Sequence, residues 1–124
     1  QQEISPTALK ELMSKMRARP SLMEGLARTY KFVGGADDLL RGLTLIMVLA
    51  KADPENKYTP IGWRRNYLKC EIYLQYGRDF RDQGALENVV TLINQWESLG
   101  ILQNSGLESE FKKLRAEALK LLGK

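Results

Sequence analysis

The sequence predicts an all-α fold, an up-and-down four-helix bundle with a kinked first helix and an additional C-terminal helix. Three observations lead to this prediction. Apolar residues recur at helical spacing in every long segment, and no segment alternates apolar and polar residues as a half-buried strand does. Ser5-Pro6 and Thr59-Pro60 each combine an N-cap residue with a proline at the first helical position. The connecting segments are short, so neighbouring helices should be antiparallel.

The first predicted helix begins at Ser5 and is broken or kinked at Pro20, after which Ser21 can cap a restart. The Gly34-Gly35 pair is typical of a helix end. Apolar residues recur at helical spacing on both sides of the proline, which predicts one buried face for each half. They are Leu9, Leu12, Met13, Met16, Leu22, Met23, Leu26, Ala27 and Tyr30.

The second predicted helix spans residues 36–52. Asp37 and Asp38 suit its positive N-terminal end. Its apolar stretch, 42–50, is much shorter than the roughly 20 residues that a membrane span needs. Because the helix is apolar on most of its circumference, we expect it to be the most buried one.

The third predicted helix spans residues 60–80 and should end at Gln83-Gly84. One stripe of it is apolar and includes Cys70, which we expect to be a buried, inert thiol. The stripe consists of Trp63, Tyr67, Cys70 and Leu74, with Leu68 and Ile72 beside it.

Two further helices follow. The fourth carries Leu86, Val89, Val90, Ile93 and Trp96 and stops at Gly100. The last shows a heptad seam of Leu107, Phe111, Leu114, Ala118 and Leu121. We therefore divide the chain into a four-helix bundle, 1–103, and a C-terminal helix, 104–124, whose seam packs either on the bundle or on another protein.

The composition excludes much enzyme chemistry. The 124 residues contain no histidine and one cysteine, so no Ser-His or Cys-His pair, imidazole ligand, zinc cluster or internal disulfide can form. The acidic residues suit helix ends, loops and surface ion pairs better than a catalytic pair. We therefore expect no catalytic residue, no metal site and no cofactor, and a protein that works by binding.

The net charge of +4 is unevenly placed, with +3 in residues 1–35 and +2 in residues 59–83. This pattern favours an acidic partner surface or a polyanion, although each basic residue could equally be an ordinary solvated side chain. Tyr73 and Tyr76 fall partly off the apolar stripe and could line a groove or contact a partner. The candidate partner-binding residues are Lys10, Lys15, Arg17 and Arg19 in the first helix, and Arg64, Arg65, Lys69, Tyr73, Tyr76, Arg78 and Arg81 in or just after the third.

The segment from Trp63 to Tyr76, WRRNYLKCEIYLQY, resembles the characteristic segment of the PsbQ-like extrinsic subunits of photosystem II. In that family a Trp precedes an Arg/Asn-Asp-Leu-basic run, and a Tyr-Leu-Arg-Tyr step follows. The C-terminal AEALKLLGK is also similar to the family's last helix. Trp63 lies closer to the Tyr-Leu step than in the family, and the proline-rich arm of plant members is absent, which favours a divergent algal member such as the additional extrinsic subunit of diatoms. Arg65, Asn66, Leu68 and Lys69 match the first run, and Tyr73, Leu74, Gln75 and Tyr76 match the second.

The resemblance implies a non-catalytic four-helix bundle, monomeric when free, in the thylakoid lumen of a chloroplast. Such a subunit docks electrostatically on lumenal subunits of photosystem II and meets the membrane through that complex. It helps the manganese-calcium cluster to retain calcium and chloride, and Arg64, Arg65 and Lys69 lie in the matched segment. A start without Met fits either a mature form or a trimmed chain. The alternative is a helical adaptor or nucleic-acid-binding module that uses the same basic face.

Overall fold

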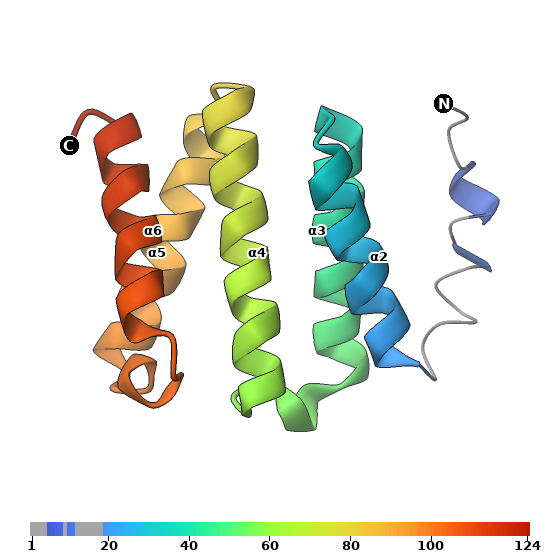
Figure 1. The fold of residues 1–124 in the computed structure, drawn as a ribbon, viewed down its shortest axis with the longest axis horizontal. Helices are drawn as coiled ribbons and strands as arrows, with labels where there is room; N and C mark the ends of the chain where they lie inside the picture. The colour runs from blue at the N-terminus through green and yellow to red at the C-terminus, as the bar shows by residue number, and fades with distance from the viewer. Residues whose placement is uncertain (1–4, 9, 12–18) are drawn as a thin grey trace.

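The computed structural model describes residues 5–8, 10–11 and 19–124, and these form helices and turns with no strand among them. The all-α prediction is thus confirmed for this part of the chain. The helices are α2 (Pro20–Val33), α3 (Ala36–Ala52), α4 (Pro60–Asp79), α5 (Gln83–Ser98) and α6 (Glu108–Leu121), with short 3₁₀ turns η1 (Pro54–Asn56) and η2 (Leu102–Asn104). Successive helices run up and down, side by side, with α4 between the α2–α3 pair and the α5–α6 pair (Figure 1).

The ends of the helices follow the local sequence signals closely. The N–H of Ala8 donates to Ser5 Oγ at 3.1 Å, and that of Gly62 to Thr59 Oγ1 at 3.4 Å, so both predicted N-caps are confirmed. α2 ends at Gly34, whose φ of 79° is left-handed. The break expected at Pro20 is confirmed, because Arg19 is not helical and α2 begins at Pro20. The stripe of Leu9, Leu12, Met13 and Met16 lies outside the described residues.

Two local predictions are wrong. Ser21 does not cap a restart, because Pro20 itself takes the first helical position of α2. Gln83-Gly84 does not separate α4 from α5 but forms the first turn of α5. The N-cap is Asp82, whose Oδ1 accepts from the N–H of Ala85 at 2.9 Å.

The helices enclose two hydrophobic clusters rather than one. The first joins α2 and α3 to one side of α4, where Leu68 and Ile72 face it. The second joins the opposite side of α4, with Cys70 and Leu74, to α5 and α6. A single four-helix bundle is therefore not confirmed, and the expectation that residues 36–52 form the most buried helix is wrong, because α4 takes that position.

The C-terminal helix packs on its neighbours. Phe111 and Ala118 of α6 are fully buried in the second cluster, as the heptad seam predicts. The rings of Trp63, Trp96 and Phe111 meet edge to face, with centroids 5.4–5.9 Å apart, where α4, α5 and α6 join. Such aromatic pairs contribute about 0.5–1.5 kcal/mol each beyond their buried area. Of the two possibilities for this seam, the structure shows packing against the rest of the chain, except at Leu121, which is 44% exposed.

Glycines allow α4 to lie close to its surroundings at both ends. A Cβ on Gly62 would overlap the backbone carbonyls of Asn56 and Lys57, so the turn after α3 can cross the start of α4 there. A Cβ on Gly77 would lie 2.5 Å from Leu86 Cγ, which shows how closely α4 and α5 approach. In contrast, a Cβ on Gly25, on the exposed face of α2, would meet nothing within 4 Å.

We predict that Gly77→Ala lowers the free energy of unfolding by about 1–3 kcal/mol, because the added methyl group overpacks the α4–α5 contact. Gly25→Ala is the matched control and should raise it by about 0.5–1 kcal/mol, because alanine is the better helix former. Urea unfolding followed by circular dichroism measures both. Equal stabilities for the two variants would contradict the close packing of α4 on α5.

Candidate functional site

Three arginines surround one buried carboxylate between α2 and α4. Glu24 of α2 is 6% exposed. Arg64 Nε donates to its Oε2 at 2.8 Å, and Arg65 Nε donates to its Oε1 at 3.2 Å. Arg28, one turn further along α2, donates to Oε2 at 3.3 Å. Burial alone would raise the pKa of Glu24, but the hydrogen bonds from Arg64 and Arg65, with the charge of Arg64, outweigh it and hold that pKa below its usual value.

Arg65 extends this contact to the turn that follows α3. Its Nη1 donates to Asp53 Oδ2 at 2.8 Å, and Asn56 Nδ2 donates to both oxygens of the same carboxylate at 2.9 and 3.0 Å. The hydrogen bonds from Arg65 and Asn56 lower the pKa of Asp53. Because the side chain of Arg65 is 11% exposed and contacts two carboxylates, it is an internal link between α2, η1 and α4. We call Glu24, Arg28, Asp53, Arg64 and Arg65 the arginine–carboxylate cluster.

The other predicted binding residues differ in their exposure and in their ion pairs. Lys10, Arg19 and Arg81 are exposed, whereas Arg78 forms surface ion pairs with Asp79 and Glu117. Lys15 and Arg17 lie outside the described residues. Arg64 keeps about half of its side chain exposed although it contacts Glu24. Of these candidates, Arg64 and Arg78 therefore have carboxylate partners within the chain, whereas Arg19 and Arg81 have none among the described residues.

Lys69, Tyr73 and Tyr76 are instead brought together on one side of α4. There a groove runs between α3 and α5, with α4 as its floor. It comprises two pockets, of about 260 and 400 Å³, that follow the same helical faces: Lys69 lines the first and the two tyrosines line the second. Tyr73 and Tyr76 thus line a groove, while their contact with a partner stays a prediction.

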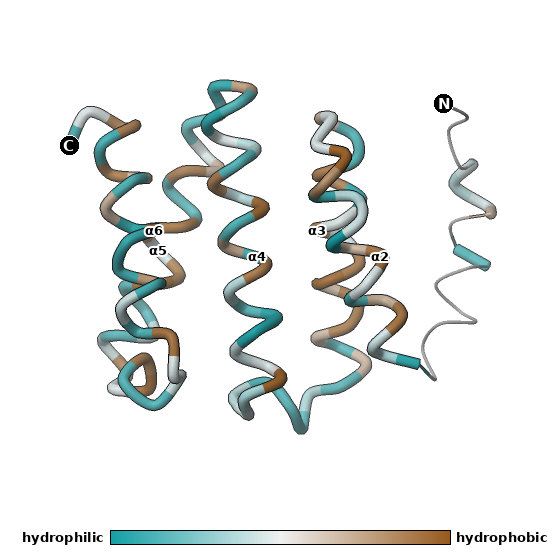
Figure 2. Tube along the Cα trace, viewed as in Figure 1, coloured by the Kyte–Doolittle hydropathy of each residue, from teal (hydrophilic) through white to brown (hydrophobic). Residues whose placement is uncertain are grey.

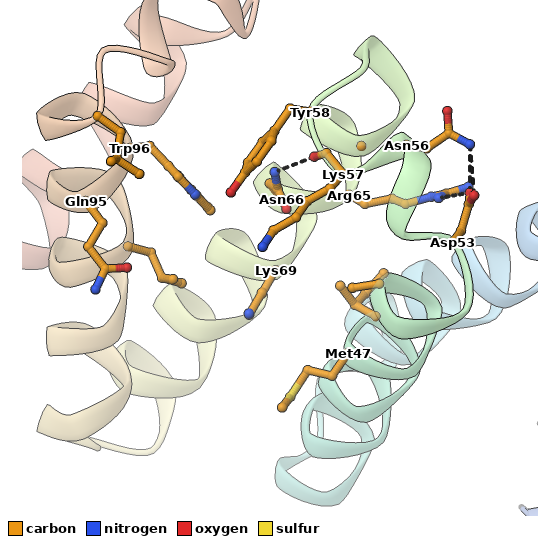
Figure 3. Close-up of a pocket in the computed structure, with 15 residues that line it drawn as sticks. Met47, Asp53, Asn56, Lys57, Tyr58, Arg65, Asn66, Lys69, Gln95 and Trp96 are labelled. Atoms are coloured by element: carbon orange, nitrogen blue, oxygen red, sulfur yellow. Dashed lines mark hydrogen bonds and ion pairs between the residues drawn. The ribbon is translucent and has the colours of Figure 1, made fainter.

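Figure 3 shows the first pocket, with Met47 of α3 facing Gln95 and Trp96 of α5 across the open space. The side chains of Lys57 and Lys69 extend into this space (Figure 3). Lys57 Nζ lies 5.3 Å from the ring centroid of Tyr58. In Figure 2, hydrophobic residues recur along α3 and α5, while the turn that carries Asp53 and Lys57 is hydrophilic. The pocket thus combines apolar walls with two amino groups.

Lys69 has no partner for its charge among the residues that the structure describes, where neither a hydrogen bond nor an ion pair involves its amino group. Burial lowers the pKa of Lys69, and the nearby charge of Lys57 lowers it as well. Asp53 also lines this pocket, but Arg65 and Asn56 occupy its carboxylate. An anionic group entering the pocket would therefore meet Lys69 without displacing an internal partner.

No known family, curated protein or solved structure matches this chain. Within the described part of the chain no group of three or more Cys, Asp or Glu residues could hold a metal ion. No helix there is both long enough and apolar enough to cross a membrane. What the groove offers is an apolar surface with cationic side chains, which suits binding.

Sequence reasoning missed several groove residues. Lys57 and Tyr58 lie in a turn with no periodicity to mark them, and Leu99 follows the last residue of α5. Met47 belongs to the apolar stretch 42–50 of the helix that the sequence predicts to be the most buried, yet it is 46% exposed. One sequence signal could have indicated the exposure of Met47. Residues 36–52 are apolar on most sides of the helix, and two neighbouring helices cannot cover all of that apolar surface.

Cys70 is buried as predicted, and desolvation raises the pKa of its thiol to about 12. The thiolate is the reactive form, so we predict that the native protein reacts with an aromatic disulfide reagent at pH 8 at least a hundredfold more slowly than the protein in 8 M urea. Absorbance of the released thiolate gives the rate. Equally fast reaction in both states would contradict the burial of Cys70 between α4 and its neighbours.

Glu24→Gln should lower the free energy of unfolding by about 1–3 kcal/mol at pH 7, because it removes charge-assisted hydrogen bonds to Arg64 and Arg65. The pKa of Glu24 is lower in the folded chain than its ordinary value of 4.5, so its contribution is complete above that pH and is lost as the pH falls through the folded-state pKa. The difference between wild type and variant should therefore shrink towards pH 3. Urea midpoints at pH 7 and pH 3 measure it.

The control for this prediction is Glu117→Gln, which removes an exposed ion pair with Arg78 and should change stability by less than about 0.5 kcal/mol at pH 7. A difference between wild type and Glu24→Gln that stays constant from pH 7 to pH 3 would show that the Glu24 carboxylate does not contribute through its charge.

Proposed function

We propose that this chain is a non-catalytic binding subunit that docks on the lumenal face of photosystem II, in the thylakoid lumen of a chloroplast. There it would stabilise the oxygen-evolving manganese-calcium cluster and its retention of calcium and chloride. The proposal includes the four-helix bundle of the PsbQ-like subunits. The described residues agree with such a bundle in forming helices that run up and down side by side.

The observation that carries the proposal concerns the segment of the resemblance, Trp63–Tyr76. It lies within one helix, α4, and that helix forms the floor of the open groove with Lys69, Tyr73 and Tyr76. An acidic lumenal surface would complement the amino groups of Lys57 and Lys69. The absence of histidine from the sequence agrees with a protein that works by binding.

The arginine–carboxylate cluster changes which residues can test this proposal. Charge reversal at Arg65 would break the contacts with Glu24 and Asp53, so lost binding could reflect lost stability. Arg19 and Arg81 are exposed, and no ion pair with a described residue involves them. They are therefore cleaner probes of an electrostatic docking face.

We predict that the chain binds to salt-washed photosystem II membranes and restores oxygen evolution at low chloride and calcium. Arg19→Glu and Arg81→Glu should each weaken binding two- to tenfold, and 0.5 M NaCl should weaken it further, because salt screens exposed charges. Sedimentation of the membranes with bound protein gives the affinity, and an oxygen electrode gives the activity.

The matched control is Lys113→Glu, an equal charge change on the exposed side of α6. No binding and no recovery with the wild-type chain would overturn the proposal. The alternative, a nucleic-acid-binding module, would instead give a mobility shift with DNA or RNA whose log affinity falls linearly and steeply with log salt concentration.

A further inference from the structure

The groove between α3 and α5 continues along four turns of α4. Its floor runs from Gly62 to Tyr76, which corresponds to about 21 Å at the rise of an α-helix. The wall residues recur at intervals of three and four on both sides, so one face of α3 and one face of α5 line its whole length. On α3 these are Leu39, Leu40, Leu43, Ile46, Met47 and Ala50, and on α5 they are Gly84, Ala85, Glu87, Asn88, Leu92, Gln95 and Trp96, with Leu99 just beyond.

Apolar side chains stand exposed along this groove. Leu40 is 44% exposed, and Met47, two helical turns further along α3, is 46% exposed. Leu99, at the end of the opposite wall, is 69% exposed. A groove with an apolar row at helical spacing on α3, and with Leu92, Trp96 and Leu99 among the polar residues of the opposite wall, can receive the apolar face of an amphipathic helix.

The two ends of the groove carry opposite charges. Lys57 and Lys69 lie at the end near the start of α4, where the one carboxylate among the described lining residues, Asp53, is held by Arg65. Asp82 and Glu87 line the other end. A helix in this groove would therefore match it with acidic residues at one end and a basic residue at the other.

We propose that the α3–α5 groove binds an amphipathic helix of a partner protein, about four turns long, with carboxylates beside Lys57 and Lys69 and a basic residue beside Asp82 and Glu87. This inference rests on that part of the proposed function in which the chain works by binding another protein. The bound helix would cover Leu40, Met47 and Leu99 and form a four-helix unit with α3, α4 and α5. A small anion would fill the first pocket alone and leave Leu40, Tyr73 and Tyr76 uncovered.

The probe is a synthetic 18-residue peptide, acetylated and amidated, with leucines at heptad a and d positions, two glutamates in one terminal turn and two lysines in the other. A second peptide has the two charged turns exchanged, so that both orientations are tested. Calorimetry with the full chain should detect micromolar binding of one of them. Amide shifts in ¹⁵N spectra should fall on Tyr58, Asn66 and Tyr73, and not on the exposed residues of α6.

A charge exchange makes the test specific. Lys57→Glu combined with Lys69→Glu should weaken binding of the better peptide at least tenfold, and replacing its glutamates with lysines should restore most of that loss. Lys113→Glu, outside the groove, should change the affinity less than twofold. Circular dichroism shows whether each variant keeps its helices, and a double variant that unfolds is replaced by Lys57→Gln with Lys69→Gln, for which at least a threefold loss is expected.

Three results would overturn the inference: no binding of either peptide at 200 μM, binding that the charge exchange leaves unchanged, or a dimer in sedimentation that Met47→Glu dissociates, since a second copy would then occupy the groove. Failure here is distinguishable from failure of the proposed function. If the wild-type chain binds photosystem II but the lysine variants bind it equally well, the groove inference fails alone. If a peptide binds in the groove as described but the wild-type chain does not bind photosystem II, the proposed function fails alone.

Discussion

The arrangement of the whole chain depends on α4 being apolar on two opposite sides. Leu68 and Ile72 face one cluster, while Cys70 and Leu74 face the other, so α2–α3 and α5–α6 pack on different sides of one helix. Because the two pairs are held apart by α4, α3 and α5 leave a groove between them. A helix that was apolar on one side would gather its neighbours around a single core and leave no such groove.

The basic residues divide into those that hold the fold together and those that can meet a partner. Arg65 joins Glu24 to Asp53 and so fixes α2 and the turn after α3 against α4. Buried arginine–carboxylate contacts of this kind are costly to break, since either partner would be left charged and unpaired. Lys69, one helical turn further along α4, has no such partner among the described residues and faces the groove. A charge count by itself cannot distinguish these two roles.

Local signals in the sequence predict the helices well but not their assembly. Thr59-Pro60 and Gly34 define helix ends through their own backbone chemistry, and the heptad seam with Phe111 predicts the buried face of α6. The separation of Leu68 from Cys70 into different clusters depends on which helices lie nearby, which periodicity does not specify. The groove position of Tyr73 and Tyr76 was predictable because both fall off the main stripe. Lys57 in a turn and Arg65 beside Asp53 and Glu24 were not, since tertiary contacts alone define their roles.

Photo-crosslinking from positions inside and outside the α3–α5 groove tests most directly whether the groove is the surface that binds the proposed partner, photosystem II. A benzophenone amino acid would replace Met47, which is half-exposed in the groove, or Leu121, which is equally exposed at the end of α6 outside the groove. After binding to salt-washed photosystem II membranes and illumination, position 47 should crosslink to one subunit and position 121 should not. Crosslinks from position 121 alone would contradict the groove as the docking surface.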